Sequence, residues 1–122
     1  MKVRDAINTR VISIDSDANL LEAARRMEEH QVDVLAVVTG DGSPAGVVTD
    51  HELASTAEAS NPRTTPVATA MPEEMAGCYE DVEFVEAIQI MMLMRIRHMP
   101  VFDQHDQLIG FVSAQPRTHD IH

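Results

Sequence analysis

Residues 34–49 read Val-Leu-Ala-Val-Val-Thr-Gly-Asp-Gly-Ser-Pro-Ala-Gly-Val-Val-Thr, and residues 98–113 read His-Met-Pro-Val-Phe-Asp-Gln-His-Asp-Gln-Leu-Ile-Gly-Phe-Val-Ser. A shift of 64 residues aligns these two stretches without a gap, and the agreement continues outward from them in both directions. Such self-similarity indicates that one supersecondary unit has been duplicated. Nine positions are identical at this register: Val3/Val67, Ala6/Ala70, Asp17/Asp81, Glu22/Glu86, Ala23/Ala87, Met27/Met91, Val37/Val101, Gly46/Gly110 and Val48/Val112.

Each copy shows the same order of predicted elements. Alternating and continuous apolar runs predict strands, apolar residues at i, i+3/i+4 spacing predict helices, and Gly, Pro, Asp and Ser clusters predict turns. In the first copy we expect a strand at 11–14, a turn and helix cap at 15–17, a helix at 18–30, strands at 34–38 and 45–48, and a short helix from 50 to about 57. In the second copy we expect a strand at 76–79, a helix at 82–95, and a hairpin of 99–103 with 108–113.

The fold class that follows is α/β (α+β), two tandem β-α-β-β-α repeats in one integrated domain, because 122 residues leave no room for a second independent core. A stretch rich in Ser, Thr, Ala, Asn and Pro predicts a linker between the copies. The expected boundaries are repeat 1 at 1–57, the linker at 58–66, repeat 2 at 67–116 and a flexible tail at 117–122.

Composition excludes several classes of function. The 20 acidic residues against 9 Lys and Arg give a formal charge of -11, which repels a nucleic-acid backbone. The longest apolar runs fall far short of the ~20 residues that cross a bilayer. The first residues do not read as a secretory signal, so we expect a cytoplasmic protein without nucleic-acid or membrane partners. Cys78 is the only cysteine and cannot form an internal disulfide.

Three motifs, by their order within the duplicated unit, resemble those of a cystathionine-β-synthase-type (CBS) domain pair, a free-standing Bateman module. They are Val67–Pro72 (Val-Ala-Thr-Ala-Met-Pro), Gly46–Leu53 (Gly-Val-Val-Thr-Asp-His-Glu-Leu) and Arg97–Asp103 (Arg-His-Met-Pro-Val-Phe-Asp). The resemblance covers residues 1 to about 116. It implies that the repeats pack by their sheets about a pseudo-two-fold axis and leave clefts that bind AMP, ADP, ATP, S-adenosylmethionine or related adenosyl ligands. It also implies frequent pairing of modules into a homodimer.

The resemblance implies four ligand-binding residues in this chain: Thr49, Glu52, Arg97 and His98. Thr49 matches a hydroxyl near the ligand phosphate, and Glu52 stands where the family usually has an aspartate on the ribose. The guanidinium of Arg97 suits phosphate oxygens, and His98 assists when it is protonated.

The positions that correspond to these four residues in the other copy of the repeat are poor matches. Ser113 is followed by Pro116 at the acidic position, and Asp33 and Val34 replace the arginine and histidine. The sequence therefore favours one competent cleft and a degenerate second one.

Two functions stay open. The first is a regulatory sensor in which an adenosyl ligand between the repeats changes their conformation or the dimer, which an unknown effector protein reads. The second is a degenerate, ligand-free dimerisation or scaffold module, in which Thr49 and Glu52 form only a helix capping box and Arg97 is only a surface residue. We expect no enzyme activity, because no nucleophile, base and oxyanion donor occur at recognisable spacing, and we expect no required cofactor.

The remaining patterns concern metals and partners. The six histidines have no matching Cys or paired carboxylate pattern, so no metal site is expected. The outward positions of the first long helix, Arg26, Glu28, Glu29 and His30, become Ile90, Met92, Leu93 and Met94 in the second. Because an apolar outer face should be covered, we expect a homodimer through this helix.

Overall fold

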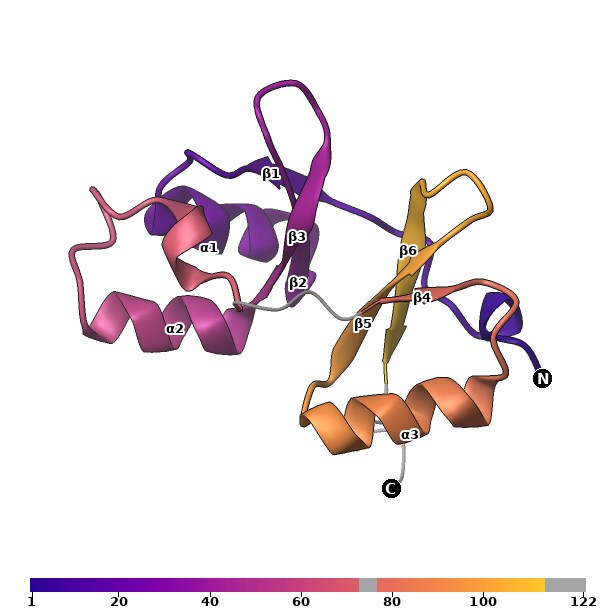
Figure 1. Cartoon of the computed structure of the whole chain (residues 1–122). Helices are drawn as coiled ribbons and strands as arrows, with labels where there is room; N and C mark the ends of the chain where they lie inside the picture. The colour runs from indigo at the N-terminus through magenta and orange to yellow at the C-terminus, as the bar shows by residue number, and fades with distance from the viewer. Residues whose placement is uncertain (73–76, 114–122) are drawn as a thin grey trace. The chain divides into compact units, whose positions relative to one another are not determined.

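The computed structural model describes residues 1–72 and 77–113 (Figure 1). The order strand, helix, strand, strand occurs twice along the chain, and two short 3-10 helices, η1 and η2, lie among these elements. In chain order the elements are η1 (Val3–Asp5), β1 (Ser13–Asp15), α1 (Leu20–His30), β2 (Val34–Val38), β3 (Pro44–Thr49), α2 (Asp50–Glu58), η2 (Val67–Ala70), β4 (Cys78–Tyr79), α3 (Phe84–Met94), β5 (His98–Phe102) and β6 (Leu108–Ser113).

The two three-stranded sheets share one topology and one register. In the first sheet β1 lies parallel to β2 and β2 antiparallel to β3; in the second, β4, β5 and β6 repeat this order. The irregularity in the ladder falls between Val37 and Val38 in one sheet and between Val101 and Phe102 in the other, again 64 residues apart. The predicted fold class, two tandem mixed α/β repeats, is confirmed. The second copy of the short helix would follow Ser113, outside the described residues.

The described residues form two compact units, which do not coincide with the two repeats of the sequence. One unit holds residues 11–72, and the other holds residues 1–10 together with 77–113. The first ten residues therefore belong with the second sheet, although their sequence opens the first repeat. Likewise η2 belongs with the first sheet, although its sequence opens the second repeat.

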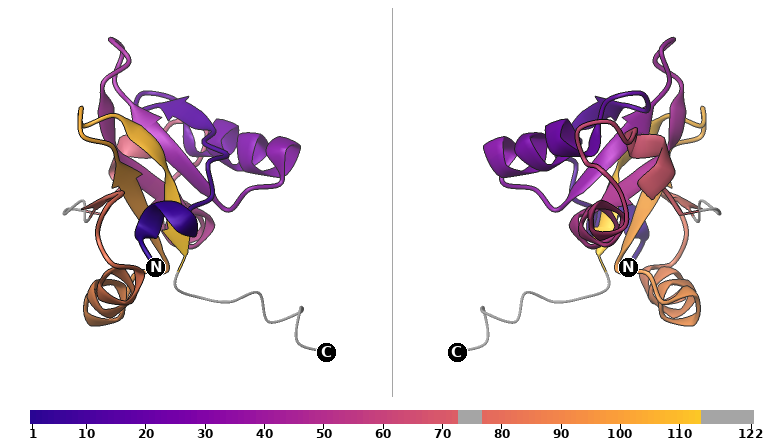
Figure 2. Two further views of the ribbon diagram at one scale, coloured as in Figure 1. Left: turned by 90° about the vertical axis from the view of Figure 1, so that its right-hand side faces the viewer. Right: turned by 90° about the vertical axis from the view of Figure 1, so that its left-hand side faces the viewer.

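Matching hydrogen bonds attach these opening segments. The Val3 N–H donates to the Val82 carbonyl (2.8 Å), and the Val67 N–H donates to the Ala18 carbonyl (2.7 Å). Val67 is the equivalent of Val3 in the repeat, and Ala18 is the equivalent of Val82. Both units therefore hold the opening segment of a repeat by the same hydrogen bond. Figure 2 shows the indigo N-terminal turn beside the yellow β6 strand of its unit. Two more pairs of backbone hydrogen bonds are equivalent in the same way. The Arg4 N–H donates to the Glu80 carbonyl as the Ala68 N–H donates to the Ser16 carbonyl, and the Phe84 N–H donates to the Met1 carbonyl as the Leu20 N–H donates to the Thr65 carbonyl.

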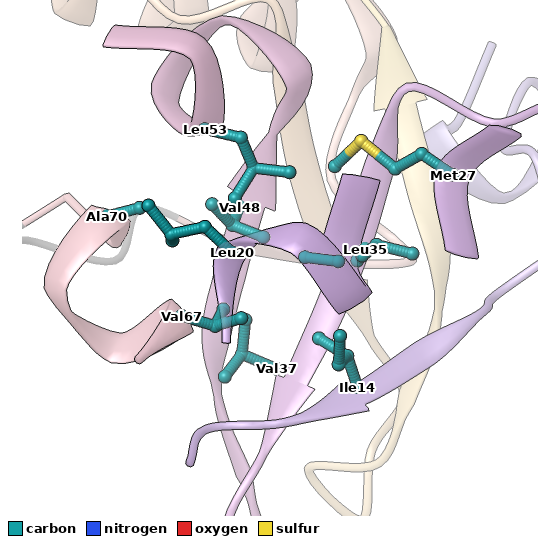
Figure 3. Packing of buried hydrophobic residues seen from close by; sticks show 10 residues of the cluster. Ile14, Leu20, Met27, Leu35, Val37, Val48, Leu53, Val67 and Ala70 are labelled. Atoms are coloured by element: carbon teal, nitrogen blue, oxygen red, sulfur yellow. The ribbon is translucent and has the colours of Figure 1, made fainter. Parts of the chain in front are cut away.

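The core of the 11–72 unit lies between its sheet and its helices (Figure 3). The α1 residues Leu20, Ala23 and Met27 are buried at the spacing that puts them on one helix face. They meet the alternate β2 residues Leu35 and Val37, both fully buried. The other members of this core are Ile14, Val48, Leu53, Val67 and Ala70.

The other unit has a core of its own, built in the same way, where the chain length predicts a single core. Ala87 and Met91 of α3 are fully buried, at the positions that match Ala23 and Met27. The η1 residue Val3 is buried in the same cluster, so the opening segment supplies core contacts as well as hydrogen bonds. The remaining members are Cys78, Met99, Val101 and Val112.

Two local predictions are wrong. The turn at 15–17 does not cap α1; the cap is Asn19, whose side chain accepts a hydrogen bond from the Glu22 N–H at 2.8 Å. Asp15 instead accepts from the Asp17 N–H at 2.8 Å and closes the preceding turn. Strand β1 is also shorter than expected, because it begins at Ser13 and not at Val11. The predicted tail, residues 117–122, lies outside the described residues.

Candidate ligand-binding residues

Thr49 and Glu52 meet where β3 runs directly into α2. Thr49 is the N-cap of α2, and its side-chain oxygen accepts from the Glu52 N–H at 3.3 Å. In return the Glu52 Oε1 atom accepts from the Thr49 N–H at 2.9 Å. Both residues are half-buried. This reciprocal capping box satisfies two of the amide groups that a helix N-terminus leaves without intrahelical partners.

The capping box leaves part of each side chain available for a ligand. A hydroxyl that accepts one hydrogen bond still has its own O–H to donate, and a carboxylate has a second oxygen. The N-terminus of a helix also carries a partial positive charge that favours an anionic group. The arrangement can therefore donate to a phosphate and accept from a sugar hydroxyl without breaking the cap.

Arg97 and His98 lie in the other unit, at the start of β5. Arg97 immediately precedes the strand and is exposed, whereas His98 is its first residue and is half-buried. In the antiparallel ladder His98 pairs with Ser113 at the end of β6. The structure thus brings Thr49 and Glu52 together in one unit and Arg97 and His98 together in the other.

The weaker counterparts of these residues occupy equivalent places. Val34 pairs with Thr49 in the first ladder, as His98 pairs with Ser113 in the second. Val34 is buried and can offer only apolar contact at this position. Pro116, where the sequence departs from the acidic position, lies outside the described residues.

A surface depression of about 390 Å³ in the 11–72 unit was not predicted from the sequence. It lies between β1 and α1, and its lining includes Arg25, Arg26 and Glu29 but neither Thr49 nor Glu52. The Arg26 Nε–H donates to the Ser13 carbonyl at 2.6 Å and so ties the helix to the strand. No motif marks this place, because charged residues at successive turns of a helix usually indicate only a solvated face.

Two further features limit the chemistry of the described residues. Burial raises the pKa of the Cys78 thiol, so that this residue behaves as a core side chain and not as a nucleophile. Within residues 1–72 and 77–113, no three His, Cys, Asp or Glu side chains gather as a metal site would require.

None of the described helices combines the length and the apolar character needed to span a membrane.

The fold is a tandem repeat of one β-α-β-β unit, and Thr49 and Glu52 place a hydroxyl and a carboxylate at the start of α2. The sequence matches the CBS domain at residues 3–58 and again at residues 64–115. The chain therefore belongs to the CBS-domain family, with two tandem copies.

Relatives and solved structures agree with this assignment. The chain is 31% identical over 113 residues to the CBS domain-containing protein YhcV of Bacillus subtilis, covering 91% of this chain and 79% of that protein. It is similar in fold to the CBS domain pair of protein MJ0100 in complex with 5′-methylthioadenosine and S-adenosyl-L-methionine, with a TM-score of 0.81, 24% identity, and coverage of 93% and 90%. The CBS-domain containing protein ATU1752 of Agrobacterium tumefaciens gives a TM-score of 0.79 at 24% identity, with coverage of 92% and 87%.

Proposed function

We propose that this CBS pair is a non-catalytic regulatory module that binds an adenosyl ligand, AMP, ADP, ATP or S-adenosylmethionine. Thr49 and Glu52 are the proposed contacts to the sugar and the adjoining phosphate, and Arg97 and His98 are the proposed contacts to the phosphate chain. Binding changes the conformation or the dimer, and an effector protein reads the change.

The observation that carries this proposal is the capping box of α2. It fixes a hydroxyl and a carboxylate within three residues of each other at the positive end of a helix. An adenosyl ligand presents sugar hydroxyls that donate to such a carboxylate. The solved CBS pair that contains 5′-methylthioadenosine and S-adenosyl-L-methionine supports the same class of ligand.

Calorimetry with each of the four ligands tests the proposal. Glu52→Gln is the informative variant, because glutamine keeps the oxygen that caps the helix but loses the charge. We expect Glu52→Gln to weaken binding about tenfold, roughly 1.4 kcal/mol, while the melting temperature without ligand stays unchanged. Glu52→Asp restores the residue that is usual in the family and should tighten binding.

The phosphate contact is tested with a pair of ligands. Arg97→Ala should weaken AMP but leave adenosine unaffected, because a guanidinium grips phosphate oxygens. Arg63→Ala, an exposed arginine of the linker, is the matched control and should change neither. The absence of heat and of any melting shift with all four ligands at millimolar concentration contradicts the proposal.

A second function is favoured by the same capping box. Because the box alone satisfies Thr49 and Glu52, they need no ligand, and the module then acts as a ligand-free scaffold. In that case Glu52→Ala lowers stability through the lost cap but leaves binding to a partner protein intact. Calorimetry of the wild type separates the two functions, since only the sensor gives heat with an adenosyl ligand.

A further inference from the structure

The depression between β1 and α1 has no part in the proposed function. Its volume of about 390 Å³ is in the range of pockets that hold small ligands. β1 is an edge strand of its sheet, and α1 runs beside it (Figure 1). Neither Thr49 nor Glu52 lines the depression, so a molecule bound there would occupy a second site.

Charged side chains of both signs line this depression. Four of them come from α1 at the i, i+3, i+4, i+7 spacing of one helix face, and β1 adds a fifth. They are Glu22, Arg25, Arg26 and Glu29 of α1 and Asp15 of β1. Two guanidinium groups and three carboxylates therefore border one space.

These charges do not neutralise one another. Glu22 and Arg26 are four residues apart, as are Arg25 and Glu29, a spacing at which opposite charges on a helix commonly pair. Neither couple forms an ion pair within residues 1–72 and 77–113. The charged groups of α1 therefore keep hydrogen-bonding capacity for a bound molecule.

Arg26 is held in place by the strand. Its Nε–H donates to the Ser13 carbonyl at 2.6 Å, which leaves the N–H groups on the two terminal Nη atoms for another partner. A guanidinium suits a carboxylate or a phosphate, because its parallel donors match the spacing of two oxygens. We therefore expect an anionic group of the ligand at Arg26.

The carboxylates select among anionic ligands. Glu22, Glu29 and Asp15 outnumber the two arginines, so the lining repels a dianion such as a phosphate monoester. The same carboxylates accept hydrogen bonds from an ammonium group. A molecule with one carboxylate and one ammonium group matches both signs of charge.

The rest of the lining is apolar. Ile14 is buried, and Ala18 and Val38 are half-buried, so these side chains form an apolar part of the depression. An aliphatic group of the ligand can pack there and lose contact with water. A carboxylate, an ammonium group and an aliphatic side chain together describe an apolar α-amino acid.

The second repeat lacks this chemistry. The positions of α3 that match Arg25, Arg26 and Glu29 are Gln89, Ile90 and Leu93. Ile90, which the sequence pattern places on the outward face, is half-buried and packs against the core of its own unit. The equivalent place in the second unit therefore cannot hold the same zwitterion.

We propose that the depression between β1 and α1 binds a free apolar α-amino acid. Its carboxylate contacts Arg25 and Arg26, its ammonium group contacts Glu22 and Glu29, and its side chain packs on Ile14. The dissociation constant should be about 0.1–1 mM, because ion pairs exposed to water contribute little. None of these residues is a proposed adenosyl contact, so each site can be tested without the other.

An NMR titration with L-leucine and three truncated ligands tests the proposal. Glycine lacks the side chain, 4-methylpentanoate lacks the ammonium group, and 3-methylbutylamine lacks the carboxylate. Each should bind at least tenfold more weakly than L-leucine, whose amide shifts should centre on Ser13, Ile14 and Ala18. Three results overturn the proposal: no shift at about 10 mM L-leucine, equal binding of any truncated ligand, or shifts centred on Thr49.

Substitutions taken from the second repeat test the arginines. Arg25→Gln and Arg26→Ile introduce the residues of the matching α3 positions, which a helix of this fold accommodates. Each should weaken L-leucine about tenfold, with an unchanged circular dichroism spectrum and unchanged affinity for AMP. Arg4→Gln, at an exposed arginine of the other unit, is the control and should change nothing. Wild-type affinity for L-leucine in both α1 variants overturns the proposal.

Glu29→Gln separates recognition of the ammonium group from loss of structure. Glutamine keeps the size of the side chain but not its charge, so L-leucine should bind several-fold more weakly. 4-Methylpentanoate has no ammonium group to lose and should bind as it does to the wild type or more tightly. An equal loss of affinity for both ligands would mean that Glu29 acts only through the structure of the depression and would overturn its assigned contact.

Discussion

Gly110 of β6 lies directly against the backbone of Asn8: a Cβ atom added at Gly110 would stand 2.5 Å from the Asn8 carbonyl oxygen. The neighbouring Phe111 exchanges two backbone hydrogen bonds with Asn8, at 2.8 and 2.9 Å. Glycine is needed here because a strand and the opening segment of the chain approach too closely for any side chain. The glycine at position 110 is therefore explained by the packing of a segment that lies about 100 residues away in the sequence.

Gly110→Ala should destabilise the protein by about 1–3 kcal/mol, because the added methyl group must displace the backbone of residues 8 and 9. Gly40→Ala is the matched control, since its Cβ would meet nothing within 4 Å. Thermal denaturation of the two variants measures the difference. Equal melting temperatures would show that the opening segment is not held against β6.

Thr49→Ala should lower the free energy of unfolding by about 1 kcal/mol, because the side chain that caps α2 is removed. Thr49→Ser keeps the hydroxyl and should stay within a few tenths of the wild-type value. Urea denaturation without ligand gives both numbers. A Thr49→Ser protein as unstable as Thr49→Ala would mean that the methyl group, and not the cap, matters at this position.

The hairpin loop between β2 and β3 provides a prediction about pH. Hydrogen bonds from the Thr39 hydroxyl and from Ser43 lower the pKa of Asp41 from 3.8 to about 2. A folded-state pKa below the unfolded value stabilises the fold above about pH 3.8, and this contribution disappears as the pH falls toward 2. An NMR titration of the Asp41 carboxyl should therefore show a midpoint near 2.

Thr39→Val removes the largest cause of this shift and should move the midpoint back toward 3.8. A wild-type midpoint near 3.8 would show that the loop does not hold Asp41 in solution.

The secondary structure could be predicted where the apolar pattern of the sequence is simple. The Val34–Val38 run gives β2 with its bounds unchanged, because an uninterrupted apolar stretch of five residues has few alternatives as a buried strand. The cap of α1 was misplaced because Asp15, Ser16, Asp17 and Asn19 all have cap-forming side chains within one turn. Only the backbone path decides which of them faces the free amides of α1.

The pairing of segments could not be predicted from the repeat. Val3 and Val67 are equivalent by sequence, and nothing local distinguishes packing on the same copy from packing on the other; tertiary hydrogen bonds make that choice. The same limit applies to the candidate site. The capping box of Thr49 and Glu52 follows from their spacing of three residues, whereas the roles of Arg97 and His98 depend on tertiary structure and stay predictions.

The two long helices end in a way that offers a gain in stability. Gln31 and Arg95, again 64 residues apart, follow α1 and α3 with φ angles of 53° and 58°, in the left-handed region where a side chain is strained. Gln31→Gly should therefore raise the free energy of unfolding by about 1 kcal/mol and the melting temperature by about 4 °C.

The control for this variant is Ala24→Gly, an exposed position inside α1, where glycine should cost about 1 kcal/mol. Gln31→Ala, which keeps the Cβ atom, should give no gain. Differential scanning calorimetry of the three proteins compares these effects directly. Because the Gln31 N–H still bonds to the carbonyls of Met27 and Glu28 whatever its side chain, only relief of backbone strain separates the glycine variant from the alanine one. A loss of stability in Gln31→Gly would show that the flexibility added to the unfolded chain outweighs that relief.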